Sequence, residues 1–285
     1  MFVPQNLKNM NRVSTYIRQS LQDLYPPQEV KSLTMMICCD ILGYQAVDVY
    51  LGKDINLSES KQQELENILA RMRKNEPIQY IRGVADFYGM RFCVAPGVLI
   101  PRPETAELVE LILRENPDAA TLLDIGTGSG CVAISLSRHL PEAKVTAWDV
   151  SGDALAIALR NNELLGTSVA FEQRDVLTYE GGDTFDVIVS NPPYVTEAEK
   201  SDMDANVLDW EPELALFVPD DDPLRFYRRI ALLGKTLLAS GGKLYFEINR
   251  AYGGATACML EEMGYRHIRV LKDLFGNDRI VTANR

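Results

Sequence analysis

The chain has 285 residues, 46% of them hydrophobic and 24% charged, which is typical of a globular protein with at least one sizeable core; this length predicts about two domains. The formal net charge of −11 disfavours non-specific binding to nucleic-acid phosphates and suits a basic protein partner better. The five cysteines include no C-x-x-C pair and the two histidines are isolated, so we expect neither a disulfide framework nor a metal centre.

The amino-terminal residues lack the apolar stretch of a signal peptide, and no run approaches the ~20 apolar residues that a membrane span needs. We therefore expect a cytoplasmic protein with reduced cysteines.

Residues 1–80 are predicted to form a small all-α bundle, because apolar residues recur at three- and four-residue spacing. Pro26, Gly43 and Gly52 separate the helical segments, and Ser58 is a suitable N-cap for the last one. The helices are expected at residues 10–24, 27–42, 47–51 and 59–74.

The composition changes near residue 80. Residues 81–102 are rich in glycine and aromatic side chains, which predicts a β-hairpin that links two domains. Pro103 then suits the first turn of a helix that runs to about residue 114.

Residues 103–285 alternate between strand and helix patterns, which predicts an α/β fold with a mainly parallel sheet covered by helices on both faces. The segment DLFGNDRIV enters a last strand through a turn and can pair antiparallel with its neighbour. Strands are expected at residues 121–125, 144–148, 168–172, 185–190, 243–248 and 267–271, and helices at 130–139, 152–165, 223–239 and 252–263.

The segment LLDIGTGSG places a glycine-rich loop directly after an apolar strand. Ligands of open parallel sheets bind at this end of the strands, and glycine lets the backbone approach them closely. The spacing is G-x-G-x-G and not the G-x-G-x-x-G of dinucleotide folds, and Asp124 would repel a pyrophosphate. S-adenosylmethionine is cationic and has no phosphate, so these residues favour it; a tight turn without a ligand is the alternative.

Two further strand ends extend the predicted cofactor site. Asp149 follows the second strand, where its carboxylate can accept hydrogen bonds from both ribose hydroxyls. Asp175 can accept from the adenine amine, and Val176 can offer an apolar face to the ring. A capping role in a turn is equally compatible with Asp175.

The fourth strand runs into Asn191, Pro192, Pro193 and Tyr194. The two prolines predict a stiff, extended loop that presents acceptors, among them the Asn191 side-chain oxygen and the Pro192 carbonyl. These two can hold the hydrogens of a planar NH2 group, while Tyr194 stacks on it. Such orientation matters for an amide nitrogen, which is a poor nucleophile. An ordinary turn is the alternative.

These segments, with GVLIPRPET, WEPELAL and DLFGNDRIV, resemble the peptide chain release factor N5-glutamine methyltransferases, the PrmC (HemK) family, over nearly the whole chain. The resemblance implies a Rossmann-like class I methyltransferase domain with a seven-stranded mixed sheet at residues 103–285. It also implies that the substrate is the glutamine of the Gly-Gly-Gln loop of release factors. A glutamine side chain offers little surface for recognition, so we expect residues 1–80 to recognise the substrate. Ala106 and Asn249 depart from the family pattern, and we expect neither to touch the main sites.

By position, the resemblance assigns Asn191, Pro192, Pro193 and Tyr194 to catalysis and substrate binding. No direct nucleic-acid binding, no membrane contact and a monomer are expected. The predicted cofactor-binding residues are Asp124, Gly126, Thr127, Gly128, Ser129, Gly130, Asp149, Asp175, Val176 and Asn191.

Several interpretations remain open at this point. The Asn-Pro-Pro-Tyr loop also serves N6-adenine and N2-guanine nucleic-acid methyltransferases, although the net charge and the lack of a Lys/Arg-rich segment speak against them. A non-catalytic scaffold on the same fold is the other alternative. Arg102 and Glu104 either lie near the cofactor or form a solvated pair, and WEPELAL either packs as a loop or touches the substrate.

Overall fold

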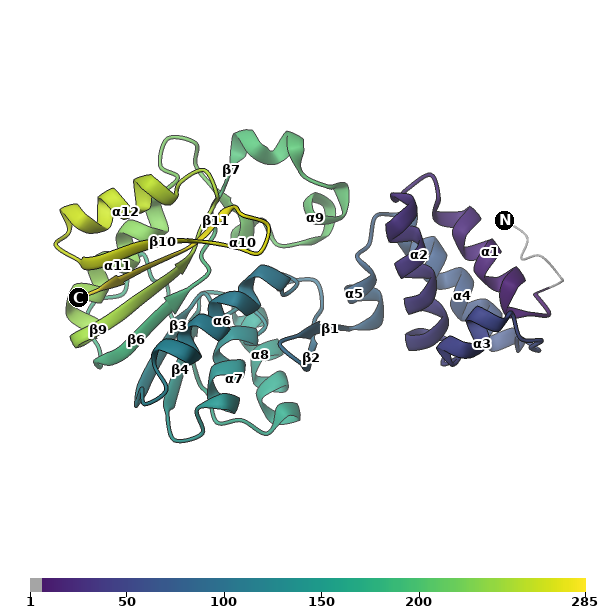
Figure 1. The fold of residues 1–285 in the computed structure, drawn as a ribbon, viewed down its shortest axis with the longest axis horizontal. Coiled ribbons are helices and arrows are strands. Elements are labelled where there is room, and N and C mark those ends of the chain that lie inside the picture. The colour runs from purple at the N-terminus through teal and green to yellow at the C-terminus, as the bar shows by residue number, and fades with distance from the viewer. Residues whose placement is uncertain (1–6) are drawn as a thin grey trace. The chain divides into compact units, whose positions relative to one another are not determined.

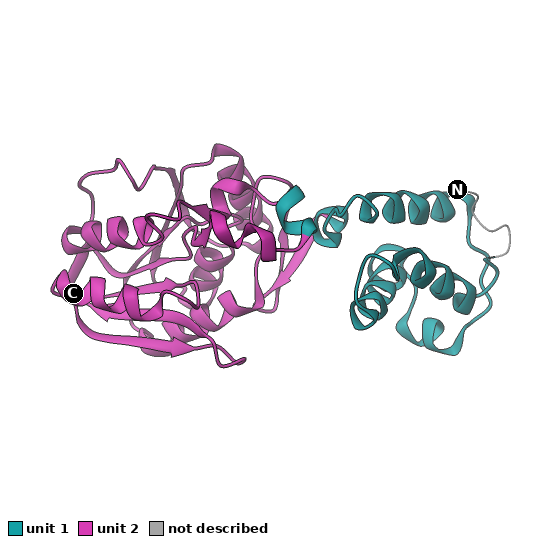
Figure 2. Ribbon diagram, turned by 90° about the horizontal axis from the view of Figure 1, so that it is seen from above, with its two compact units in different colours: residues 1–82, 205–210 teal, residues 83–204, 211–285 magenta. Residues whose placement is uncertain are grey.

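The computed structural model describes residues 7–285, and these form two compact units (Figure 2). Unit 1 comprises the chain up to Arg82 together with Ala205–Trp210, and unit 2 comprises the remainder. None of the helices within residues 7–285 is both long and apolar enough to cross a bilayer.

Unit 1 is a bundle of short helices around one apolar core (Figure 1). Asn9 caps the first helix by accepting from the Arg12 N–H at 3.0 Å, and Ser58 caps the fourth, as predicted, by accepting from the Lys61 N–H at 3.4 Å. The helices are α1 (Met10–Leu21), α2 (Pro27–Met36), η1 (Ile37–Ile41), α3 (Ala46–Leu51), α4 (Glu59–Met72), α5 (Ile78–Arg82) and α9 (Ala205–Trp210).

The expected helix at residues 27–42 is interrupted. The α-helix α2 ends at Met36, and η1 continues it as a π-helical turn in which the Leu42 N–H donates to the Ile37 carbonyl. A π-helical turn holds one more residue than an α-helical turn. Ile37, Cys38 and Leu42 are all buried.

The division into units differs from the expected ranges 1–80, 81–102 and 103–285. Helix α9 was expected in the C-terminal domain but groups with unit 1, where the Trp210 indole N–H donates to the Lys74 carbonyl at 2.9 Å and Asn75 donates to Asp209 at 3.1 Å. The expected linking hairpin packs within unit 2. Its strands are β1 (Val84–Phe87) and β2 (Met90–Cys93).

Unit 2 contains a seven-stranded mixed sheet, which confirms the predicted fold class (Figure 1). The strand order is β10-β11-β9-β6-β3-β4-β5, with β9, β6, β3, β4 and β5 parallel. The last strand lies between β9 and β10 and pairs antiparallel with both. The strands are β3 (Thr121–Ile125), β4 (Lys144–Asp149), β5 (Ala170–Gln173), β6 (Phe185–Ser190), β9 (Leu238–Glu247), β10 (Arg266–Lys272) and β11 (Asp278–Asn284).

Alternating strand residues build one apolar core on each face of the sheet. In β3, Leu122 packs with α6 and α7, whereas Leu123 packs with α11 and α12 on the other face. These buried faces leave the carboxyl ends of the parallel strands at one edge, where the site lies. The helices are α6 (Pro103–Glu115), α7 (Cys131–His139), α8 (Gly152–Leu165), α11 (Arg225–Leu237) and α12 (Gly253–Glu262).

Short elements that the periodicity did not predict follow β6. Strands β7 and β8 pair in parallel, and this pairing places residues 211–218 beside the segment that follows β6. The elements are β7 (Val195–Thr196), η2 (Glu197–Asp202), α10 (Glu213–Leu216) and β8 (Phe217–Val218).

Candidate active site

A cavity of about 250 Å³ opens at the carboxyl ends of β3, β4 and β6, and all residues that line it belong to unit 2. Its walls combine apolar side chains with carboxylates and bare backbone, and its size suits a small-molecule ligand. Of the predicted site residues, those that line it are Gly126, Gly128, Asp149, Asp175, Val176, Asn191, Pro192 and Pro193.

The three glycines of the loop after β3 serve different purposes. All three have positive φ, at 78° for Gly126, 55° for Gly128 and 81° for Gly130, which glycine adopts at no steric cost. A Cβ on Gly126 or Gly128 would meet no atom within 4 Å, so the backbone there is bare toward the cavity. A Cβ on Gly130 would lie 2.9 Å from the Ile134 side chain, and Gly130 does not line the cavity, so it serves helix packing.

Asp124 lies at the end of β3, fully enclosed, and accepts a hydrogen bond from the Thr127 hydroxyl at 2.6 Å. Burial raises the pKa of Asp124 to about 7, because the ionised form loses its hydration. Asp124, Thr127 and Ser129 line a second cavity of about 40 Å³ that shares Gly128 and Asn191 with the main one.

The raised pKa of Asp124 predicts a pH-dependent stability. A carboxyl with a higher pKa in the folded state binds more protons when folded, so the wild type loses stability as the pH rises from about 4 to about 7 and loses no more above that window. Asp124→Asn keeps an acceptor for Thr127 but does not titrate. Both proteins are unfolded thermally from about pH 4 to about pH 8. As the pH rises, the Tm of the variant should increase relative to that of the wild type. A Tm difference that stays constant with pH would contradict the raised pKa.

Asp149, at the end of β4, fastens the glycine loop. Its two oxygens accept from the Gly128 N–H at 2.8 Å and the Ser151 N–H at 2.9 Å. Each carboxylate oxygen retains acceptor capacity that can serve ligand hydroxyls. Burial raises the pKa of Asp149, while the backbone N–H donors act in the opposite direction.

Asp149→Ala is therefore expected to weaken S-adenosylmethionine binding by about 10- to 100-fold, since charge-assisted hydrogen bonds contribute ~1.5–3 kcal/mol. Calorimetric titration measures the Kd. The matched control is Asp186→Ala, which removes a carboxylate on β6 that accepts from the Ala120 and Thr121 N–H groups and lines neither cavity. Unchanged affinity in the first variant would exclude Asp149 from the cofactor site.

Asp175 and Val176 lie at the wall of the main cavity beyond β5. The Asp175 carboxylate accepts from the Leu177 N–H at 2.9 Å, so it stabilises the turn in the way that the alternative interpretation described. The Val176 carbonyl accepts from the Arg229 guanidinium at 3.0 Å, and this bond ties the cavity wall to α11.

Tyr194 does not occupy the expected position. It lines neither cavity, and its hydroxyl donates to the buried Glu247 at 3.2 Å. Its N–H donates to the Leu216 carbonyl, and its carbonyl accepts from Asn249 at 3.2 Å. Burial raises the pKa of Tyr194, and the negative charge of Glu247 raises it further by a smaller amount. Tyr194 thus anchors the loop, and Asn249, which lines neither cavity, contacts the loop through the Tyr194 carbonyl.

Arg102 pairs with Glu211 and not with Glu104. Its guanidinium lies 2.6 Å from Glu211, which is buried and also accepts from the Ile100 N–H at 3.1 Å. The pair joins GVLIPRPET to WEPELAL, and both segments reach the main cavity, the first through Leu99 and the second through Leu214 and Ala215. The sequence did not identify these lining residues individually; the motifs that contain them were the only signal.

These features fit S-adenosylmethionine. The bare glycine backbone and the carboxylates suit a cationic ligand with hydroxyls, and the apolar wall at Val176, Phe226 and Ile230 suits a purine ring. Residues 7–285 contain no cluster of three or more His, Cys, Asp or Glu side chains arranged to hold a metal ion.

Comparison with known proteins gives the family of the chain. Residues 13–83 match the model of the PrmC N-terminal domain, and residues 103–208 match the methyltransferase small domain. A methyltransferase from Pyrococcus furiosus shares the fold, with a TM-score of 0.53 at 20% identity over 77% of this chain and 98% of that one.

The similarity to curated proteins extends over the full length. The release factor glutamine methyltransferase of Bacteroides thetaiotaomicron is 68% identical over 97% of this chain and 100% of its own length. That of Flavobacterium psychrophilum is 42% identical over 95% of this chain and 97% of its own. The chain is therefore an S-adenosylmethionine-dependent methyltransferase and belongs to the family of release factor glutamine methyltransferases.

Proposed function

We propose that this enzyme methylates the side-chain nitrogen (N5) of the glutamine in the Gly-Gly-Gln motif of a peptide chain release factor. The orientation of Asn191 carries the proposal. Its Nδ2 donates to the Thr105 hydroxyl at 3.3 Å, so its Oδ1 remains available as an acceptor in the cavity that Asn191 lines. A primary amide supplies the donors that this acceptor requires.

S-adenosylmethionine supplies an electrophilic methyl group. Asn191 Oδ1 and the Pro192 carbonyl each accept one hydrogen of the target NH2 group, which fixes the nitrogen and opposes delocalisation of its lone pair. The nitrogen would form one bond to the methyl carbon while the carbon–sulfur bond of the sulfonium breaks and its electron pair stays on sulfur, and the nitrogen would then release one proton. The two acceptors stabilise the positive charge that develops on nitrogen before this proton leaves.

We also propose that unit 1 binds the release factor. A glutamine side chain offers little surface for recognition, so selectivity must come from contacts beyond the reacting amide. The net charge of −11 suits a basic protein surface and opposes direct nucleic-acid binding. We expect a cytoplasmic protein, because a release factor acts in translation. We also expect a monomer, and light scattering measures its mass.

The test is incubation with S-adenosylmethionine labelled in its methyl group and a purified bacterial release factor. Mass spectrometry of the digested product should find one added methyl on the glutamine of Gly-Gly-Gln, and a release factor with that glutamine replaced should stay unlabelled. Parallel reactions with DNA and RNA examine the rival substrates. Label on a nucleobase, or on another residue of the release factor, would contradict the proposal.

A further inference from the structure

A buried carboxylate lies behind the reactive loop. Glu247, the last residue of β9, is only 1% exposed and lines neither cavity. Its Oε2 accepts from the Thr105 hydroxyl at 2.6 Å and its Oε1 from the Tyr194 hydroxyl at 3.2 Å. A buried carboxyl group that accepts two hydrogen bonds and has no contact with the cavity calls for a reason, because the burial of such a group is costly.

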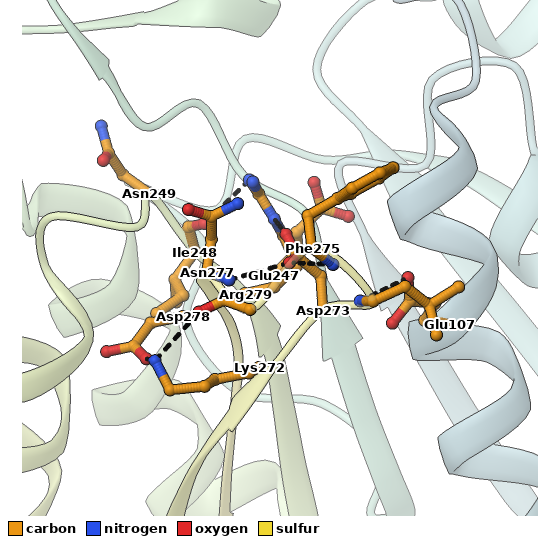
Figure 3. Close-up of polar contacts among 12 residues, drawn as sticks. Glu107, Glu247, Ile248, Asn249, Lys272, Asp273, Phe275, Asn277, Asp278 and Arg279 are labelled. Atoms are coloured by element: carbon orange, nitrogen blue, oxygen red, sulfur yellow. Dashed lines mark hydrogen bonds and ion pairs between the residues drawn. The ribbon is translucent and has the colours of Figure 1, made fainter.

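Arg279 of β11 supplies the counter-charge (Figure 3). Its guanidinium is held by the Asp273 carboxylate at 3.2 Å and by the Ile248 carbonyl at 3.5 Å. Burial raises the pKa of Glu247, and the hydrogen bond from Thr105 and the positive charge of Arg279 offset part of that rise. The turn between β10 and β11 thus places a cation beside Glu247 that opposes its protonation.

When Glu247 is ionised, which the charge of Arg279 favours, the hydrogen bonds of Thr105 have one direction. A hydroxyl has a single proton, and the proton of Thr105 is directed to Glu247, so Oγ1 can only accept from Asn191. The group of Asn191 that faces Thr105 must therefore be the NH2. Its carbonyl oxygen is turned to the opposite side, where an acceptor for a substrate amide is required.

We propose that Glu247 is a positioning residue for methyl transfer: through Thr105 it fixes which face of the Asn191 amide meets the substrate, and through Tyr194 it holds the loop that carries Asn191. This inference rests on the proposed function. Neither Glu247 nor Thr105 touches the reacting nitrogen, so their effect is on orientation, and a small misplacement of a reacting group can cost about 10²-fold in rate.

Glu247→Gln tests the direction of the hydrogen bonds with almost no change of shape. A carboxamide has one acceptor oxygen and one donor nitrogen, so it cannot accept from Thr105 and Tyr194 together. We expect kcat with the release factor to fall by about 10²-fold, while the KM and Kd for S-adenosylmethionine stay within about twofold, because Glu247 is not part of that site.

Thr105 provides the matched pair. Thr105→Val removes the hydroxyl at nearly constant volume and should reproduce the loss of kcat, whereas Thr105→Ser keeps the hydroxyl and should restore most of it. Thr256→Val is the control for loss of a buried hydroxyl, since the Thr256 hydroxyl is buried in unit 2 and has no hydrogen-bond partner. Equal activity of the Val and Ser variants, or normal kcat in Glu247→Gln, would overturn the proposal.

A second measurement needs no methyl acceptor. In protein labelled with ¹⁵N-asparagine, the side-chain NH2 signal of Asn191 is identified by its absence in Asn191→Ala. We expect this signal to be shifted and slow to exchange in the wild type and in Thr105→Ser, and to lose both properties in Thr105→Val and Glu247→Gln. A signal that is the same in Thr105→Val and Glu247→Gln as in the wild type would refute the positioning role, even if the release factor proved not to be the substrate. Loss of the shift and of the slow exchange in these variants would support the role in the same case.

Discussion

Asn191→Ala is expected to lower kcat with a release factor by about 10²–10³-fold, the usual cost of removing one preorganised group that stabilises developing charge. The variant loses the acceptor that holds the target nitrogen. It also loses the Nδ2 donor to Thr105, whereas the prolines of the loop and its anchors at Tyr194 remain. Single-turnover kinetics with a saturating release factor measure the loss directly.

The affinity for S-adenosylmethionine should fall much less, because Asn191 is only one of many residues around the main cavity. Asn116→Ala is the matched control. It removes an amide that donates to Ile112 and Tyr245 and lines neither the main cavity nor the smaller one beside it. A near-normal kcat in Asn191→Ala would show that the two-acceptor mechanism is wrong for this enzyme.

Deletion of residues 1–82 should lower kcat/KM for intact release factor by about 10²-fold, because a few anchors worth ~2–4 kcal/mol dominate a protein interface. The remaining chain keeps every residue that lines the main cavity, so it should still bind S-adenosylmethionine. Methylation assays with intact release factor, combined with calorimetry for the cofactor, separate the two effects.

The structure adds a control to this experiment. The deletion removes Lys74 and Asn75, the partners of Trp210 and Asp209 in α9. Trp210→Ala in the full-length chain disturbs the same contact but retains unit 1. If this single substitution is as harmful as the deletion, displacement of α9 explains the loss. If the deleted chain has the full-length kcat/KM, residues 1–82 have no part in recognition.

The sequence by itself determined the elements that arise from local rules. Period-3.6 patterning located four helices of unit 1, α1 to α4, and Ser58 caps the fourth of them as expected. Alternation of strands and helices predicted the parallel sheet, and that sheet required the ends of β3, β4 and β6 to meet at one edge. The cavity residues at those ends, such as Gly128, Asp149 and Asn191, could therefore be predicted from one chain.

The tertiary structure alone decided which distant residues meet. Thr105 and Glu247 are 142 positions apart and Arg102 and Glu211 are 109 apart, yet each pair shares a hydrogen bond at 2.6 Å. Insertion of β11 between β9 and β10, which brings Arg279 to Glu247, is likewise a long-range pairing. Periodicity reports which side chains are buried, but the partner of a buried polar group depends on how separate elements pack, and no local pattern encodes that choice.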